Sequence, residues 1–166
     1  MISRTQSGFT LLELMLVILI IGLMVGTVSL ALPDSSDQKL QQQASRLHAQ
    51  INLASQQTVF QNTDIGLLVT ADSYQFYQYQ GDNWALLEPQ SRFSARSLPA
   101  QAFYELSLDG QPIDLSETQQ PQVLFFSDGQ MSDFELALRI DQQPQSFRIR
   151  SNLSGQTALT RTGPKP

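Results

Sequence analysis

Residues that could do acid–base, nucleophilic or metal chemistry are few and dispersed in this sequence. The chain has no cysteine, so it has no thiol nucleophile, disulfide or iron–sulfur cluster. Its one histidine, His48, has no nucleophile-elbow motif to serve. The aspartates of the second half stand singly in turns, where aspartate supports backbone geometry, and they form no EF-hand ligand series. We therefore predict that the protein is not an enzyme and holds no metal ion and no cofactor.

Glu13 is the one charged residue in a long apolar run, residues 9–32. A helix over this run is about 36 Å long, enough to cross the roughly 30 Å hydrocarbon core of a bilayer. An ionised acid inside a membrane helix costs about 2.5 to 3.5 kcal/mol on insertion scales, so it is expected to have a partner or a function. The alternative is that Glu13 only reaches the headgroup region and pairs with its own terminus.

The charges that flank the apolar run predict its orientation. Arg4 precedes the run and Asp34 follows it, so the positive-inside rule places the N-terminus in the cytoplasm and the bulk of the chain outside. The rival interpretation is a removed secretory signal, cleaved after Ser29-Leu30-Ala31 to leave Leu32 first. The run is longer than the typical apolar region of a signal, about 7 to 15 residues, which favours a retained membrane helix.

Two glycines in the apolar run form a G-x-x-x-G pattern, Gly22 and Gly26. This pattern lets helices approach closely, although ordinary tolerance of glycine in a membrane helix explains it equally well. Pro33 then removes an amide donor and predicts a kink or a break in the helix.

An amphipathic helix is predicted over residues 33–62, with Ser35-x-x-Gln38 as its capping box. Its apolar stripe repeats at helical spacing and should pack on a sheet. The stripe consists of Leu40, Ala44, Leu47, Ile51, Ala54 and Thr58, and the opposite, polar face of Gln41, Gln42, Arg46, Gln50 and Gln57.

Residues 63–166 alternate short β-rich runs with turn signals and predict an antiparallel β-sandwich-like head, giving an α+β fold overall. The predicted strands are 65–70, 74–79, 84–87, 103–108, 123–127, 134–140, 147–151 and 157–160. Residues 123–126 are apolar on both faces and predict a central strand. The stretches 88–102 and 111–122 fit no pattern and are expected to be loops.

The C-terminal part is rich in cations, and Arg148 and Arg150 point from one strand face. Such a patch is a candidate for nucleic-acid binding. The alternative is a solvated strand face on which Glu135 pairs across strands. The net charge of −5 and the small number of cations argue against DNA binding.

The segment Ser7-Gly8-Phe9-Thr10-Leu11-Leu12-Glu13 resembles the prepilin signature of type IV pilins and type II secretion pseudopilins. The resemblance implies that a membrane peptidase cuts between Gly8 and Phe9 and that Phe9 is then N-methylated. It also implies that Glu13 pairs with the Phe9 amine of a neighbouring subunit and so sets the filament register. The chain then divides into a leader (1–8), a transmembrane and filament-core helix (9–32), the amphipathic helix (33–62) and a periplasmic head (63–166).

The head resembles the H family of minor pseudopilins in its first strands and in the stretch Phe125-Phe126-Ser127-Asp128-Gly129-Gln130. The resemblance implies a pilin-like fold and a place near the tip of the periplasmic pseudopilus that drives export of folded proteins across the outer membrane. It implies the major pseudopilin G, the minor pseudopilins I, J and K, the prepilin peptidase and the bacterial inner membrane as partners. A minor type IV pilin, serving pilus assembly or DNA uptake, is the alternative.

Overall fold

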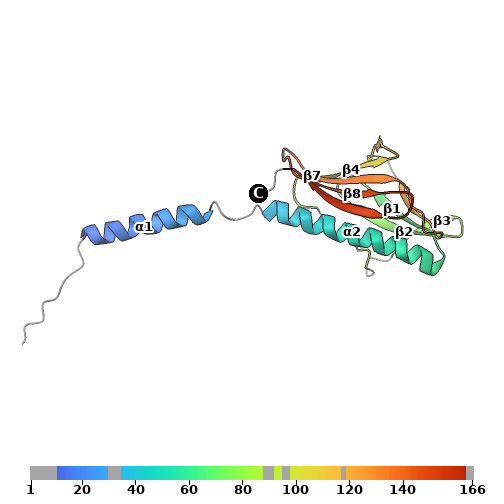
Figure 1. Ribbon diagram of the computed structural model, residues 1–166, viewed down its shortest axis with the longest axis horizontal. Coiled ribbons are helices and arrows are strands. Elements are labelled where there is room, and N and C mark those ends of the chain that lie inside the picture. The colour runs from blue at the N-terminus through green and yellow to red at the C-terminus, as the bar shows by residue number, and fades with distance from the viewer. Residues whose placement is uncertain (1–10, 30–34, 88–91, 95–97, 117–118, 164–166) are drawn as a thin grey trace, which may run out of the picture. The chain divides into compact units, whose positions relative to one another are not determined.

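The computed structural model describes residues 11–29, 35–87, 92–94, 98–116 and 119–163. The chain forms two compact units, Met1–Ser35 and Ser36–Pro166. The first contains the helix α1 (Leu11–Ser29) and the second contains the head (Figure 1). The predicted cleavage junction, Gly8 and Phe9, the predicted break at Pro33 and both ends of the predicted span 9–32 lie outside the described residues.

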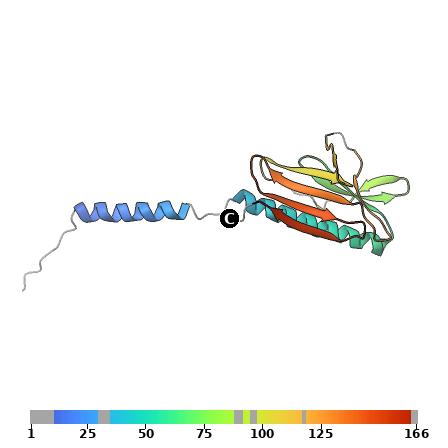
Figure 2. The ribbon, with the colours of Figure 1, turned by 45° about the horizontal axis from the view of Figure 1, so that its top comes forward.

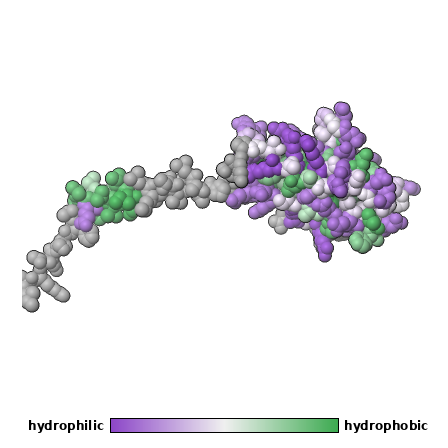
Figure 3. Space-filling view, viewed as in Figure 1, coloured by the Kyte–Doolittle hydropathy of each residue, from purple (hydrophilic) through white to green (hydrophobic). Residues whose placement is uncertain are grey.

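Apart from Glu13, helix α1 is apolar on every side over residues 11–22, whose side chains are described. Its large hydrophobic residues from Leu11 to Ile21 are between 44% and 77% exposed, and most of the helix surface visible in Figure 3 is hydrophobic. Among the described residues, no helix has both the length and the apolarity that crossing a membrane requires.

Helix α2 (Ser35–Gln61) confirms the predicted amphipathic helix almost to the residue. All six residues of the predicted apolar stripe are buried, and the five apolar ones join the core of the head. Figures 1 and 2 show α2 running along the strands. The polar face departs from the prediction at Gln50, which is buried because its amide serves groups inside the head.

Nine strands form two antiparallel sheets in the described part of the head. The four-stranded sheet has the order β3-β2-β1-β6 and the five-stranded sheet the order β5-β4-β7-β8-β9. The strands are β1 (Ile65–Val69), β2 (Tyr74–Gln80), β3 (Asn83–Leu86), β4 (Ala102–Leu108), β5 (Gln111–Ile113), β6 (Val123–Phe125), β7 (Phe134–Ile140), β8 (Ser146–Ser151) and β9 (Thr157–Thr162). Their buried faces and the α2 stripe make one hydrophobic core.

Two strand predictions were wrong. Strand β6 lies at an edge of its sheet and not at the centre. Its flanking residue Phe126 is 37% exposed, so apolar side chains on both faces did not signal burial on both faces here. Strand β5 lies in the stretch 111–122, which was expected to be a loop because it fits no pattern. It is short and lies at the edge of its sheet, where its Pro112 is tolerated.

Candidate assembly surfaces

Glu13 lies in the first turn of α1, next to the exposed apolar side chains of Leu12 and Leu14. A carboxylate in the first turn is favoured by the helix dipole. Gly22 lies in α1 with open space where a side chain would stand, since a Cβ atom there would have nothing within 4 Å, and Gly26 lies one turn later in the same helix. The structure therefore places these three predicted residues on one apolar helix, whereas Gly8 and Phe9 precede its described part.

The two arginines of the predicted basic patch lie on neighbouring positions of one face of β8 and share one acid. An Arg148 guanidinium nitrogen lies 3.2 Å from Glu135 Oε1 on β7, and Arg150 Nε donates to the other oxygen of the same carboxylate. Arg139 pairs in turn with Glu105 on β4 at 3.2 Å. The cations of this face are thus paired across strands, which supports the solvated strand face over a site for phosphates.

The His48 side chain links α2 to β9 through hydrogen bonds. Its hydrogen-bond partners among the described residues are a hydroxyl and an amide, and none is an acid. Its Nε2 lies 2.9 Å from the Thr157 hydroxyl and 3.3 Å from the Asn52 amide nitrogen. The Thr157 hydroxyl donates to Asn52 Oδ1 at 2.6 Å. The described residues contain no group of three or more acidic, histidine or cysteine side chains that could hold a metal ion.

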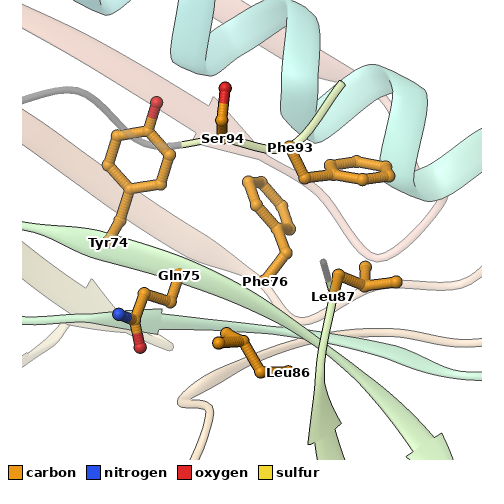
Figure 4. Close-up of a pocket in the computed structure, with 7 residues that line it drawn as sticks. All are labelled: Tyr74, Gln75, Phe76, Leu86, Leu87, Phe93 and Ser94. Atoms are coloured by element: carbon orange, nitrogen blue, oxygen red, sulfur yellow. The ribbon is translucent and has the colours of Figure 1, made fainter. Parts of the chain in front are cut away.

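A small cavity lies between β2 and the segment that follows β3 (Figure 4). It has a volume of about 200 Å³ and is lined by Tyr74, Gln75, Phe76, Leu86, Leu87, Phe93 and Ser94. The Phe76 and Phe93 rings, which both line it, pack against each other with centroids 4.9 Å apart. Ligand pockets usually measure about 300 to 1,000 Å³ and combine apolar walls with convergent polar groups. This cavity is an apolar packing gap at the edge of the core.

Gln50 is a buried polar residue that sequence reasoning misplaced. Its amide nitrogen donates to the carbonyl oxygens of Arg92 (2.8 Å) and Ser94 (3.2 Å), and its oxygen accepts a hydrogen bond from the Tyr74 hydroxyl at 2.7 Å. Arg46, one turn earlier, donates to the same Ser94 carbonyl at 3.1 Å. These bonds fasten residues 92–94 to α2, and the helical pattern alone carried no signal for them.

Burial changes the acid–base behaviour of one tyrosine. Tyr104 on β4 is buried, and this burial, with a smaller contribution from the nearby Tyr74, raises the pKa of its hydroxyl far above the usual 10.0. In contrast, hydrogen bonds from Ser116 lower the pKa of the exposed Asp114 carboxyl. The local surroundings of each group, burial for Tyr104 and the Ser116 hydrogen bonds for Asp114, account for both shifts.

Two family models match this chain in consecutive segments. The model described as "Type II transport protein GspH" matches residues 43–155. The model described as "Prokaryotic N-terminal methylation motif" matches residues 3–29. The first covers most of α2 and all strands up to β8, and the second covers α1 with the segment before it.

Individual relatives agree with both family models. The type II secretion system protein H of Pseudomonas aeruginosa is 36% identical over 146 residues, 81% of this chain and 84% of the relative. That of Pectobacterium carotovorum is 27% identical over 93% of this chain and 92% of the relative.

Solved structures show the same fold. The minor pseudopilin EpsH of the Vibrio cholerae type II secretion system aligns with a TM-score of 0.65 at 18% identity, over 79% of this chain and 99% of that one. The solution structure of Escherichia coli GspH aligns with a TM-score of 0.62 at 18% identity, over 78% and 92% of the two chains. The protein therefore belongs to the type II transport protein GspH family, the H-type minor pseudopilins of type II secretion systems.

Proposed function

We propose that this minor pseudopilin is anchored in the bacterial inner membrane by residues 9–32 and assembles near the tip of the periplasmic pseudopilus. One observation carries the proposal: the methylation motif over residues 3–29 and the GspH match over 43–155 occur in order in one chain. A filament subunit needs both a part that enters the filament or membrane and a head that contacts its neighbours.

The N-terminal segment supplies the assembly chemistry in this proposal. Cleavage after Gly8 creates a new amine at Phe9, and N-methylation leaves that amine able to carry a proton. Glu13 follows four residues later, in the first turn of α1. Its carboxylate pairs with the Phe9 amine of the neighbouring subunit and fixes the axial register, because an ion pair is worth more in an apolar surrounding than in water.

The head supplies contacts and no catalysis in this proposal. Its partners are the major pseudopilin G and the minor pseudopilins I, J and K, and the prepilin peptidase acts on the leader. The support is the GspH match and the described head, in which the one histidine, His48, is hydrogen-bonded to Thr157 on β9. Nucleic acid is not among the partners, because Glu135 pairs with both patch arginines.

A deletion with complementation tests the proposal. We expect exported hydrolases to accumulate in the periplasm of the deletion strain and to return to the medium when the wild-type gene is restored. Glu13→Gln should enter the membrane and be cleaved to the same N-terminus, shown by intact mass, yet restore export at least tenfold less well. Normal export together with lost twitching or DNA uptake would instead assign the chain to a type IV pilus.

A further inference from the structure

The two sheets of the head have chemically opposite outer faces. On the five-stranded sheet the outer face carries the paired charges Glu105, Arg139, Glu135, Arg148 and Arg150. The four strands β1, β2, β3 and β6 contain no charged residue at all. Charged residues are depleted in the cores of protein–protein interfaces. The outer face of the four-stranded sheet is therefore the one suited to a stable contact with another protein.

The strand register defines which side chains make up this face. Phe76 and Leu67 are paired and buried in the core, so the alternate residues on each strand point outward. Tyr77 pairs with Leu86, and Tyr79 pairs with Trp84. We call the accessible part of this outward set the uncharged face, and it consists of Gln75, Tyr77, Tyr79, Trp84, Leu86, Leu124 and Phe126. Leu68 points the same way but is only 8% exposed.

Gly66 is the residue of β1 that lies in the middle of the uncharged face. It pairs with Tyr77 on one side and with Leu124 on the other. A Cβ atom at Gly66 would collide with the Pro121 ring and would lie 3.0 Å from the Trp84 ring. The absence of a side chain at Gly66 thus lets Trp84 and Pro121 approach β1 closely. The Tyr79 ring contacts the Trp84 ring edge to face, with ring centroids 5.2 Å apart.

Several of these apolar side chains remain accessible in the head. Leu86 is 49% exposed, Tyr79 is 40% exposed and Phe126 is 37% exposed, while Tyr77, Trp84 and Leu124 are half-buried. Contiguous exposed apolar surface is uncommon on a monomer and marks interaction sites. Aromatic residues are enriched and charged residues depleted in the cores of protein–protein interfaces, which is the composition found here.

We infer that the uncharged face is the docking surface for the head of a different pseudopilin subunit, which presents an uncharged apolar patch to it. The inference rests on the proposed function, which requires lasting contacts between unlike heads. Charge favours this occupant, since a charged partner surface would lose its hydration against this face and gain no counter-charge.

Other occupants fit the face less well. Leu86, Leu124 and Phe126 offer no hydrogen bonds, and the Tyr77 hydroxyl already donates to Gln75 at 2.9 Å. The polar groups of the face are therefore few compared with the many hydroxyls of a glycan. A second copy of this chain would bring two bodies of the same net charge, −5, together.

Single cysteine labels provide the test, because the chain has no native cysteine. Full-length protein in detergent is prepared as Leu86→Cys and as Thr160→Cys, each carrying one environment-sensitive fluorophore. Thr160 is exposed on β9 of the charged sheet, where it pairs with Arg148, and serves as the matched control site. The probes are the purified full-length pseudopilins of the same secretion system, added one at a time at low and at high NaCl concentration.

We expect at least one pseudopilin to shift the emission of the label at position 86 and not at position 160, with affinity unchanged or increased at high salt. Leu86→Asp and Phe126→Asp, each in protein labelled at position 160, should weaken that affinity at least tenfold when binding is followed by sedimentation. Thr160→Asp, in protein labelled at position 86, should weaken it by less than twofold in the same measurement. Circular dichroism checks that each variant is folded.

Three results would overturn the inference. One is a pseudopilin that binds but changes the emission only of the label at position 160. A pseudopilin whose affinity for the Leu86→Asp variant equals its affinity for the unsubstituted protein would count equally. Another is a shift at position 86 caused by the chain's own concentration or by chito-oligosaccharide, with none caused by another pseudopilin. The third is no binding by any pseudopilin. If export is normal in the deletion strain as well, the proposed function fails with it, whereas defective export leaves that function standing.

Discussion

Gln50 connects three groups inside the head through one side chain. It bonds the Tyr74 hydroxyl and the carbonyl oxygens of Arg92 and Ser94. Buried polar groups are costly when a partner is removed, at about 1 to 3 kcal/mol for each group left unpaired. Gln50 is therefore a residue whose polarity is needed at a buried position of an amphipathic helix.

Replacing Gln50 with leucine should strongly destabilise the head. We expect Gln50→Leu to lower the free energy of unfolding by about 2 to 4 kcal/mol, because the three hydrogen bonds of the Gln50 side chain are lost at a buried position. Urea denaturation measures the change. Gln42→Leu, on an exposed position of the same helix, is the control and should change stability by less than about 0.5 kcal/mol. Equal effects for both variants would contradict the role given to Gln50.

Tyr104 presents the opposite case, since its buried hydroxyl has no hydrogen-bond partner within the described part of the chain. Tyr104→Phe should keep the stability at neutral pH or raise it by up to about 1 kcal/mol. Burial raises the pKa of Tyr104 in the folded state, so the unfolded state loses the proton first as the pH rises past 10.0. The wild type should therefore lose stability as the pH rises through this value.

The comparison of the two proteins by urea unfolding isolates the contribution of Tyr104. The variant should lose less stability over the same pH range, because it has no hydroxyl at this position to ionise on unfolding. Identical pH dependence in the two proteins would show that Tyr104 is not responsible for the alkaline loss.

At the scale of elements, strands β7 and β8 decide how the basic patch behaves. Glu135 on β7 neutralises part of the charge of Arg148 and Arg150 on β8. We expect the double variant Arg148→Ala, Arg150→Ala to change DNA retention by less than twofold at moderate salt, measured by fluorescence anisotropy. Each lost phosphate contact would otherwise reduce the slope of log K against log salt by about 0.9.

The outcome that would restore the DNA hypothesis is a large loss of retention with a smaller salt slope. Arg139→Ala, which breaks the pair with Glu105 on the same sheet, serves as the control for nonspecific loss of charge.

Elements with a clear repeat could be predicted from the sequence. The α2 stripe and the alternation of Phe134, Leu136, Leu138 and Ile140 each bury one face, and the structure buries all these residues. These patterns work because burial of one face repeats with the geometry of the element. The dipeptide Asp109-Gly110 is likewise a turn signal in the sequence, and both residues have positive φ angles as a two-residue hairpin requires.

Features set by tertiary contacts could not be predicted. The apolar composition of residues 123–126 gave no information on which strand lies beside them, so the edge position of β6 was missed. Residues 111–122 fitted no pattern, so the short strand β5 was missed. The burial of Gln50 depends on residues 92–94, which are more than forty positions away in sequence. The candidate residues of the leader and of α1 were predicted from two sequence motifs, the prepilin signature and G-x-x-x-G, without any prediction of the fold.

At the scale of the whole molecule, the head is held together without covalent links. Helix α2 and both sheets share one core. Arg161 on β9 pairs with Asp37 at the start of α2 at 2.8 Å, which ties the last strand to the first turn of the helix. Because α2 and the two sheets bury their apolar faces in the same core, we infer that all these elements unfold together.

This shared core predicts one cooperative transition in urea. The only tryptophan, Trp84, reports on the four-stranded sheet by fluorescence. In a head prepared without residues 1–34, far-ultraviolet circular dichroism reports mainly on α2. We expect the two transitions to have the same midpoint, and reducing agent to leave it unchanged because there is no disulfide. Separate midpoints would show that the helix and the sheets unfold independently.

The uniform apolar surface of α1 has a consequence for how subunits recognise one another. A helix with a single polar stripe can pack in one rotational setting, whereas a helix without one packs about equally well at any angle about its axis. In a bundle of such helices, the axial position would depend on the sole carboxylate of α1, Glu13, if it has the register role that we propose. The angle about the axis, and with it the identity of each neighbour, would then be encoded in the heads. Unlike subunits could share one interchangeable stem and still be placed in a fixed order.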